Sequence, residues 1–171
     1  MIPVIALFGL PAVGKTTTAK KLADLIHAKT RHCGDIVKAK AKELGVGLDG
    51  LSLQEHRKID ADTRNIVASA REPLVVEGRF LSEVLAGLPN VVLVNLICSE
   101  EERARRQSTR RATGGSLREQ DVSCGKLRDT LYGDVPKAAV SAILINTDGH
   151  DIDGVAKAVL QKVSRHSNDK V

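Results

Sequence analysis

The segment "FGLPAVGKTT", residues 8–17, restricts the fold of this chain more than any other stretch. It carries the pattern G-x-x-x-x-G-K-[ST], with Gly9, Gly14, Lys15 and Thr16 at the fixed positions, between an apolar run and a segment of helical periodicity. In that context the glycines let backbone N–H groups point inward as an anion nest, and the helix N-terminus adds partial positive charge. The segment therefore predicts a phosphate-binding loop (P-loop), in which Lys15 reaches the β- and γ-phosphates of a nucleotide and Thr16 directs its hydroxyl at Mg²⁺.

Apolar runs and helical patterns alternate along the rest of the chain. The segments between the runs carry helix signals, and S-x-x-E capping boxes begin two of them, at Ser52 and Ser99. This alternation predicts an α/β fold with a parallel sheet covered on both faces. The runs that we expect to form its strands are 4–8, 29–33, 74–76, 90–98 and 142–145.

The composition limits the class of protein. The chain has 171 residues with a formal charge of +5, 42% hydrophobic residues and only 2% aromatic residues. No apolar run approaches the roughly 18 residues that span a bilayer, and the three cysteines have no metal-like spacing. We expect a cytoplasmic protein, monomeric or weakly dimeric, with reduced cysteines. The lack of a long apolar run argues against a membrane, and the scarcity of stacking aromatics argues against nucleic acid. The positive charge is instead consistent with an anionic small molecule as partner.

The P-loop alone does not identify the fate of the phosphate. A GTPase normally carries N-K-x-D for guanine recognition, and the nearest match, "INTD" at 145–148, lacks the lysine. The chain is also short for the additional modules of most mechanical ATPases. These exclusions favour a small-molecule kinase, which passes the phosphate from ATP to an acceptor.

Polar residues follow the predicted strands, where ligands of a parallel sheet bind. Glu77 is a candidate Mg²⁺ ligand or acceptor-orienting carboxylate, as against a helix cap or a turn residue. Gly78 lets the backbone approach a ligand, and Arg79 suits bidentate binding of an acceptor phosphate, as against a surface arginine. Asp35 either contacts the acceptor or caps the helix that follows. Lys38, one turn later, either contacts an acceptor phosphate or is solvated.

A basic helix is predicted after the strand at 90–98. Arg103, Arg106 and Arg110 are spaced i, i+3 and i+7, so they share one helix face. Either an anion lies between them, or the face is solvated and paired with the preceding glutamates. With a P-loop present, we expect a mobile lid that neutralises the transferring phosphate. We expect it to include the flexible segment "TGGS" and the later Arg118, Lys126 and Arg128.

The order of these motifs resembles the nucleoside monophosphate kinases, and most closely the archaeal-type cytidylate kinases. The shared segments, from residue 4 to about 163, are "GLPAVGKTTTAKKLADLI", "HCGDIVKAKAKELGVGL", "VVEGR", "RARRQSTRR", "LYG" and "INTD". The resemblance implies a P-loop kinase fold of three α/β/α layers, with a parallel five-stranded sheet and a helical lid. It also implies transfer of the γ-phosphoryl group of ATP to CMP or dCMP, with Mg²⁺ as cofactor.

Motifs and resemblance together assign regions and residues to roles. We expect a single domain over residues 1–171, with the lid at about 103–128 and the acceptor-binding region at about 34–72. The candidate catalytic residues are Lys15, Asp35, Arg106 and Arg110. The candidate nucleotide-binding residues are Gly9, Ala12, Val13, Gly14, Lys15, Thr16, Thr17, Arg106, Asn146 and Thr147. The candidate acceptor-binding residues are Asp35, Lys38, Glu77, Gly78 and Arg79, and the candidate metal ligands are Thr16 and Glu77.

The chain departs from the family on the acceptor side. Lys38 stands where arginine is common, and Phe80 where bacterial cytidylate kinases often have aspartate. The first alternative is therefore a kinase with a hydroxyl of another small metabolite as acceptor, with Asp35 as the base. The second is an ATP-dependent switch or an RNA-binding protein, which the lack of stacking aromatics disfavours.

Overall fold

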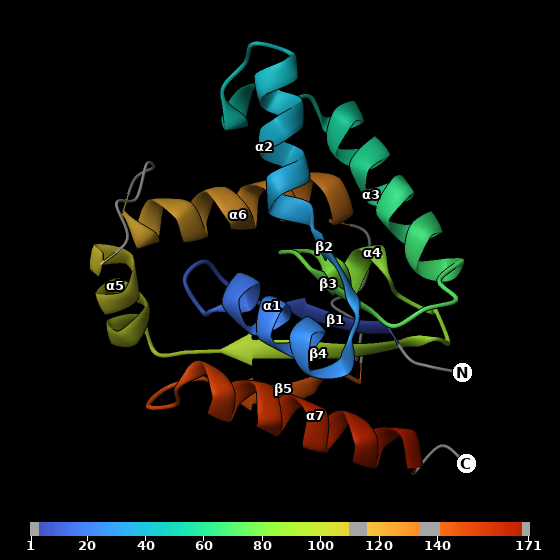
Figure 1. Ribbon diagram of the computed structural model, residues 1–171. Coiled ribbons are helices and arrows are strands. Elements are labelled where there is room, and N and C mark those ends of the chain that lie inside the picture. The colour runs from blue at the N-terminus through green and yellow to red at the C-terminus, as the bar shows by residue number, and fades with distance from the viewer. Residues whose placement is uncertain (1–3, 110–115, 134–140, 169–171) are drawn as a thin grey trace.

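The protein forms one five-stranded parallel sheet (Figure 1), as the sequence predicts. The computed structural model describes residues 4–109, 116–133 and 141–168. The strand order is β2-β3-β1-β4-β5, so β1, which leads into the P-loop, is the middle strand and β4 lies beside it. The strands are β1 (Val4–Phe8), β2 (Lys29–His32), β3 (Leu74–Glu77), β4 (Val91–Ile97) and β5 (Ile143–Asn146).

Helices connect the strands in the alternating pattern that the sequence predicts. They are α1 (Lys15–Ile26), α2 (Cys33–Glu43), the short 3₁₀ helix η1 (Leu48–Gly50), α3 (Leu53–Ala68), α4 (Leu81–Val84), α5 (Glu100–Thr109), α6 (Leu117–Tyr132) and α7 (Ile152–Asn168). In the part of the chain described, no helix has the length and hydrophobicity to cross a membrane.

Two apolar cores on opposite faces of the sheet give three layers. Alternate residues of a strand point to opposite faces. Leu7 of β1 therefore packs with Leu22 of α1 and Val159 of α7, whereas its neighbour Ala6 packs with Val67 of α3 on the other side. Helices α1 and α7 cover the first face, and α3, α4 and the end of α6 cover the second. The resulting α/β/α arrangement is the predicted fold class.

The capping signals identify two helix starts. Ser52 accepts a hydrogen bond of 3.2 Å from the backbone of Glu55 at the start of α3, and Ser99 does the same for Glu102 at 3.3 Å at the start of α5. The expectation that Asp35 caps α2 is wrong, because α2 begins at Cys33 and Asp35 lies inside its first turn. Helix α4 was not predicted, since four residues are too few to show a helical period.

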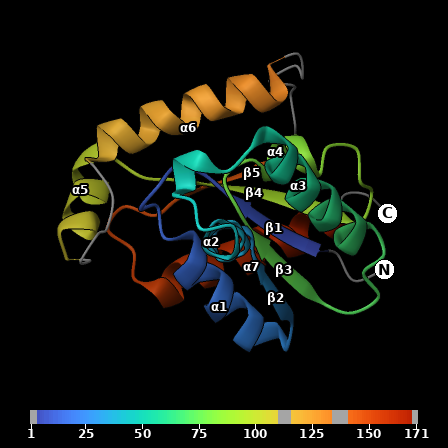
Figure 2. The ribbon, with the colours of Figure 1, turned by 90° about the horizontal axis from the view of Figure 1, so that it is seen from above.

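Helix α6 spans the distance between α5 and α3, as Figures 1 and 2 both show. At its far end the hydroxyl of Tyr132 donates a hydrogen bond to the carboxylate of Asp60 on α3. The ring centroids of Tyr132 and Phe80 lie 5.8 Å apart. Burial raises the pKa of both Asp60 and Tyr132. Helix α6 thus joins the acceptor-binding region predicted at 34–72 to the loop after β3.

Candidate functional site

The P-loop has the backbone shape of an anion nest. Gly9 and Gly14 have φ values of 143° and 95°, and Ala12 between them has φ of 63°. A Cβ on Gly9 would lie 2.3 Å from the carbonyl oxygen of Leu96, so no larger residue fits there. Left-handed residues interspersed along a loop turn neighbouring N–H groups toward one point, where the N-terminus of α1 adds positive charge. This chain can therefore hold the phosphates of a nucleotide at the predicted position.

Lys15 closes the mouth of the loop. Its Nζ donates to the carbonyl oxygens of Gly9 at 2.9 Å and Leu10 at 2.8 Å. These contacts place an ammonium group at the rim of the nest, where the outer phosphates of a bound nucleotide would lie. Val13 is buried at the base of the loop, and Thr17 lies two residues inside α1.

Thr16 and Glu77 meet, although they were assigned to the metal site only from separate motifs. The Thr16 hydroxyl donates to Oε1 of Glu77 at 3.2 Å, and Glu77 is only 5% exposed. Hard oxygen donors of this kind are what Mg²⁺ binds, usually together with phosphate oxygens and water. The residues present therefore fit a magnesium ion held against the P-loop.

His32 is a neighbour of this pair that the sequence analysis missed. Its Nδ1 lies 3.4 Å from Oε1 of Glu77, and the two residues are paired in the register of β2 and β3. The pairing of His32 with Glu77 follows from the register of β2 and β3. The sequence did not indicate it, because the segment "KTRHC" is only weakly apolar and marks its strand poorly.

Arg106 joins the P-loop to the turn after β5. Its guanidinium donates to the carbonyl oxygen of Val13 at 3.3 Å, and to the hydroxyl and carbonyl oxygens of Thr147 at 3.0 and 2.8 Å. Its Nε donates to Glu102 at 2.9 Å, and Arg105 and Arg106 together lower the pKa of that carboxyl to about 2. The structure therefore places Arg106 beside Gly14, next to the nest.

The turn that carries Asn146 and Thr147 is held firmly to the end of β4. Thr147 is 1% exposed, whereas Asn146 is exposed and its Oδ1 accepts from the backbone of Asp148 at 2.9 Å. The Asp148 carboxylate accepts from the thiol of Cys98 and from the backbone of Ser99, contacts that lower its pKa. A fixed turn next to the P-loop is compatible with the predicted contact to the nucleotide base.

The basic face expected on α5 is split between different partners. Arg103 is 5% exposed and makes a bidentate ion pair with Asp121 of α6 at 3.0 and 2.8 Å. It also donates to the carbonyl oxygen of Pro11 at 3.3 Å. Arg103 is therefore a buried link between α5, α6 and the P-loop, not one of three arginines that share an anion. Arg110 and most of "TGGS" lie outside the described residues.

The acceptor-side residues fall into two groups. Asp35 and Lys38 are exposed on α2 and pair with each other at 3.4 Å. Gly78 and Arg79 instead follow Glu77 directly, and a Cβ on Gly78 would come within 3.1 Å of the Cβ of Cys33. The close approach of α2 to β3 therefore leaves little room for a larger residue at this position.

A cavity of about 440 Å³ lies between the P-loop, the end of β4, α4 and α6. Arg79 is on its wall and donates through Nη1 to the thiol of Cys124 on α6 at 2.8 Å. None of the residues 34–72 lines it. Further lining residues are Gly9, Leu10, Phe80, Glu83, Cys124 and Arg128.

Arg128 has a place that the sequence analysis did not foresee. It was expected among the lid cations, but its Nε donates to Glu83 of α4 at 2.6 Å. Neither Glu83 nor Cys124 was a candidate, because nothing in the sequence indicated that α4 and α6 face one cavity.

Known proteins share this sequence pattern and this fold. A family model described as an AAA domain matches residues 5–124. The cytidylate kinase of Methanocaldococcus jannaschii is 27% identical over 91% of this chain and 94% of its own length. The cytidylate kinase of Ignicoccus hospitalis is 30% identical over 84% of this chain and 89% of its own length.

Solved structures of P-loop kinases show the same fold. A gluconokinase from Sinorhizobium meliloti superposes with a TM-score of 0.68 at 17% identity, over 98% of this chain and 95% of that one. A shikimate kinase from Acinetobacter baumannii in complex with shikimate gives a TM-score of 0.65 at 19% identity, over 97% of this chain and 95% of that one. At these identities the likeness concerns the fold and carries no information about the acceptor.

Proposed function

Because this chain belongs to the AAA-domain family and to the P-loop kinases related to archaeal cytidylate kinases, we propose that it transfers the γ-phosphoryl group of ATP to a nucleoside monophosphate. The acceptor that we propose is CMP or dCMP, since the curated relatives that span most of the chain are named cytidylate kinases. We further propose that residues 1–171 act as one kinase domain, monomeric or weakly dimeric.

The continuity of one cavity between the P-loop and Arg79 carries this proposal. Gly9 and Leu10, whose carbonyl oxygens hold Lys15, line the same cavity as Arg79. An acceptor in this cavity would therefore have its reacting oxygen beside the γ-phosphate end of the nest. The guanidinium of Arg79 can bind two oxygens of a monophosphate at once, which suits an acceptor that is itself a phosphate.

On this proposal, catalysis is positioning and charge neutralisation. The P-loop N–H groups and Lys15 hold the phosphates in line with the acceptor, and Arg106 balances charge from the side of α5. Thr16 and Glu77 would hold Mg²⁺, which when bound neutralises charge on the β- and γ-phosphate oxygens.

We propose that the region at about 103–128 acts as a lid. Its described part is held against the P-loop by Arg103, which donates to the carbonyl oxygen of Pro11, and by Arg106, which donates to Thr147. Such contacts exclude water from the P-loop when they form and release the product when they break. The region at about 34–72 would close the acceptor crevice from the side of α2 and α3.

The alternative is a kinase that phosphorylates a hydroxyl of another metabolite, as the names of the gluconokinase and shikimate kinases indicate for those proteins. It requires a base at the acceptor, and Asp35 is the candidate. Asp35 is exposed on α2 and is not on the cavity wall. This position is why we rank the monophosphate acceptor first.

A coupled assay of ADP release tests the proposal against a panel of CMP, dCMP, UMP, AMP, shikimate and gluconate. We expect ADP release that depends on CMP or dCMP. Dependence on shikimate or gluconate alone would support the hydroxyl acceptor. ADP release without any acceptor dependence would overturn both and favour an ATP-dependent switch.

A further inference from the structure

A nearly buried ion pair forms the end of the cavity away from the P-loop. Nε of Arg128 donates to Oε1 of Glu83 at 2.6 Å, and the side chains are only 18% and 10% exposed. The hydroxyl of Ser82 donates to the other carboxylate oxygen at 2.5 Å. Both charged residues line the cavity that contains Arg79.

The order of contacts along α6 places this pair at a defined distance from the P-loop. Asp121 is tied to the loop through Arg103, Cys124 contacts Arg79, and Arg128 contacts Glu83. Residues spaced i, i+3 and i+7 lie on one helix face. The seven residue steps from 121 to 128 rise about 10 Å along the helix, which is comparable to the extended length of a nucleoside monophosphate.

The pair retains hydrogen-bonding capacity toward the cavity. A carboxylate can accept about four hydrogen bonds and a guanidinium can donate five. Arg128 contacts Glu83 through Nε, so its two terminal amino groups can still donate to other partners. One of them, Nη1, donates a hydrogen bond of 3.3 Å to the exposed Asp129. The surrounding wall is largely apolar, with Phe8, Leu10 and Phe80 among its residues. Such a wall suits a flat ring better than a polyhydroxylated chain, which needs many polar partners.

We propose that Glu83 and Arg128 recognise the base of the acceptor and select cytosine over uracil. The inference rests on the proposed function. Glu83 would accept a hydrogen bond from the exocyclic amino group of cytosine, and Arg128 would donate to the adjacent ring nitrogen or carbonyl oxygen. Uracil presents a carbonyl oxygen in place of the amino group, so its oxygen would face the carboxylate without a proton between them. The monophosphate of the same acceptor would then lie at Arg79.

The test compares CMP and UMP as acceptors for the wild type, Glu83→Gln and Arg128→Lys. The measured quantity is the ratio of kcat/KM for CMP to that for UMP, together with the Kd of each monophosphate by calorimetry without ATP. Loss of one charged hydrogen bond corresponds to a change of about tenfold or more. We expect each variant to lower the ratio by at least that factor, by weakening CMP, with the KM for ATP unchanged.

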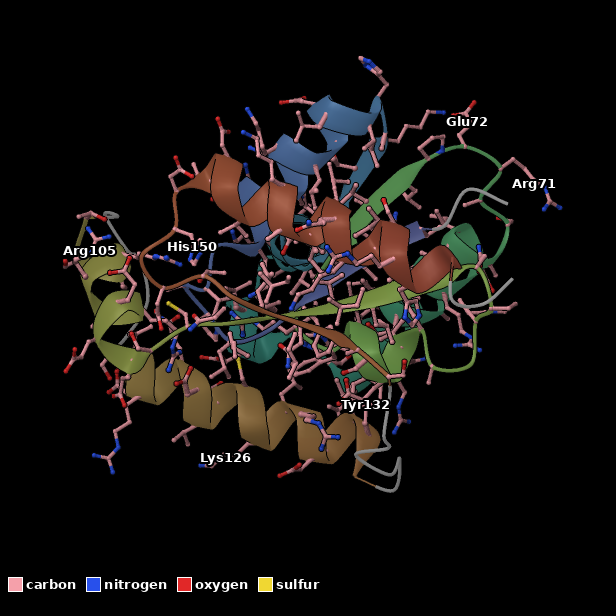
Figure 3. The ribbon with its side chains drawn as sticks, turned by 90° about the horizontal axis from the view of Figure 1, so that it is seen from below. Arg71, Glu72, Arg105, Lys126, Tyr132 and His150 are labelled. Atoms are coloured by element: carbon pink, nitrogen blue, oxygen red, sulfur yellow. The ribbon has the colours of Figure 1, made fainter. Side chains whose placement is uncertain are left out.

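Lys126→Ala is the matched control, because Lys126 is an exposed cation on α6 and points away from the body of the protein (Figure 3). It should leave the CMP/UMP ratio unchanged. If a single variant fails to fold, the double variant Glu83→Gln with Arg128→Met removes the pair without leaving an unpaired buried charge. It should likewise lower the ratio.

A purely structural pair gives a different result, namely a lower melting temperature with an unchanged CMP/UMP ratio in every folded variant. That result overturns this inference and leaves the proposed function standing. A wild-type protein that releases ADP with neither CMP nor dCMP overturns the proposed function, and this inference with it.

Discussion

The hydroxyl of Thr16 donates a hydrogen bond to Glu77 at 3.2 Å, which joins the first turn of α1 to the end of β3. The two residues are far apart in the sequence and meet because β1 and β3 are adjacent parallel strands, with Leu7 paired to Glu77. Since both oxygens lie at the rim of the P-loop, the contact defines where a divalent cation would bind.

Glu77→Gln tests this site. The amide keeps the shape and loses the negative charge, so we expect a fall in kcat of at least about tenfold that excess Mg²⁺ partly restores. The measurement is kcat as a function of Mg²⁺ concentration. Glu72→Gln is the control, because Glu72 is an exposed carboxylate near the other end of β3 (Figure 3). A variant with wild-type turnover and a stability change of only about 1 kcal/mol would show that Glu77 is a structural residue.

Lys15→Ala should nearly abolish phosphoryl transfer. Contacts of this type stabilise the transition state by about 3 kcal/mol or more, which corresponds to at least a hundredfold in kcat. The far-UV circular dichroism should not change, since the side chain of Lys15 is only partly buried at the mouth of the P-loop and belongs to neither apolar core. Lys20→Ala, at an exposed position of α1, should retain full activity. Substantial turnover in folded Lys15→Ala would contradict the phosphate-binding role of the loop.

The arginines of α5 should separate into a stability residue and an activity residue. Arg103→Ala leaves Asp121 without its partner, so we expect a loss of about 3 kcal/mol in the free energy of unfolding, measured in urea. Adding Asp121→Ala should recover part of it. Arg106→Ala should instead lower kcat more than ATP affinity. Arg105→Ala removes an exposed guanidinium and should do neither. Equal effects of Arg106→Ala on kcat and on ATP affinity would indicate an ordinary nucleotide contact.

The thiol of Cys33 should make the fold sensitive to alkaline pH. Burial raises the pKa of this thiol from 9.0 to about 11, so the folded protein holds its proton more tightly than the unfolded chain. Below pH 9 the thiol is protonated in both states, and the stability that it contributes is fully present. Between pH 9 and 11 the unfolded chain ionises before the folded protein, so the free energy of unfolding falls by about 3 kcal/mol as the pH rises through 11. Unfolding free energies measured from pH 8 to 11 should fall less steeply for Cys33→Ala than for the wild type. Parallel curves for the two proteins would contradict the buried-thiol interpretation.

The parts of this fold that the sequence predicts are those set by local pattern. The apolar runs, the glycine loop and the Ser52 cap each depend on neighbouring residues, and each appears where it was expected. The helix start at Cys33 was missed because no capping side chain marks it.

Pairings between distant helices could not be predicted. The partners of Arg103 and Arg128 are 18 and 45 residues away, on α6 and α4. They depend on how α6 crosses the sheet, which no local signal determines. The predicted acceptor residues Asp35 and Lys38 lie together and exposed on α2, where their i, i+3 spacing pairs them with each other. The roles of Arg79 and of the residues around it remain predictions.

Arg79 tests the nature of the acceptor. It follows Glu77 and Gly78 at the end of β3 and lies on the wall of the cavity that reaches the P-loop. If the acceptor is a monophosphate, Arg79→Ala should raise the acceptor KM about tenfold or more and leave the ATP KM nearly unchanged. Arg79→Lys keeps the charge but loses the two-pronged geometry, so it too should raise the acceptor KM.

The control for Arg79 is Arg71→Ala. Arg71 projects from the loop before β3, at the opposite end of the strand (Figure 3), and its removal should change neither KM. A neutral hydroxyl acceptor gives another pattern. Arg79→Ala then hardly changes the acceptor KM, because the acceptor has no phosphate for Arg79 to bind. Asp35→Asn stops turnover, because a hydroxyl acceptor needs a base. Steady-state kinetics with both substrates varied therefore decide which group receives the phosphate.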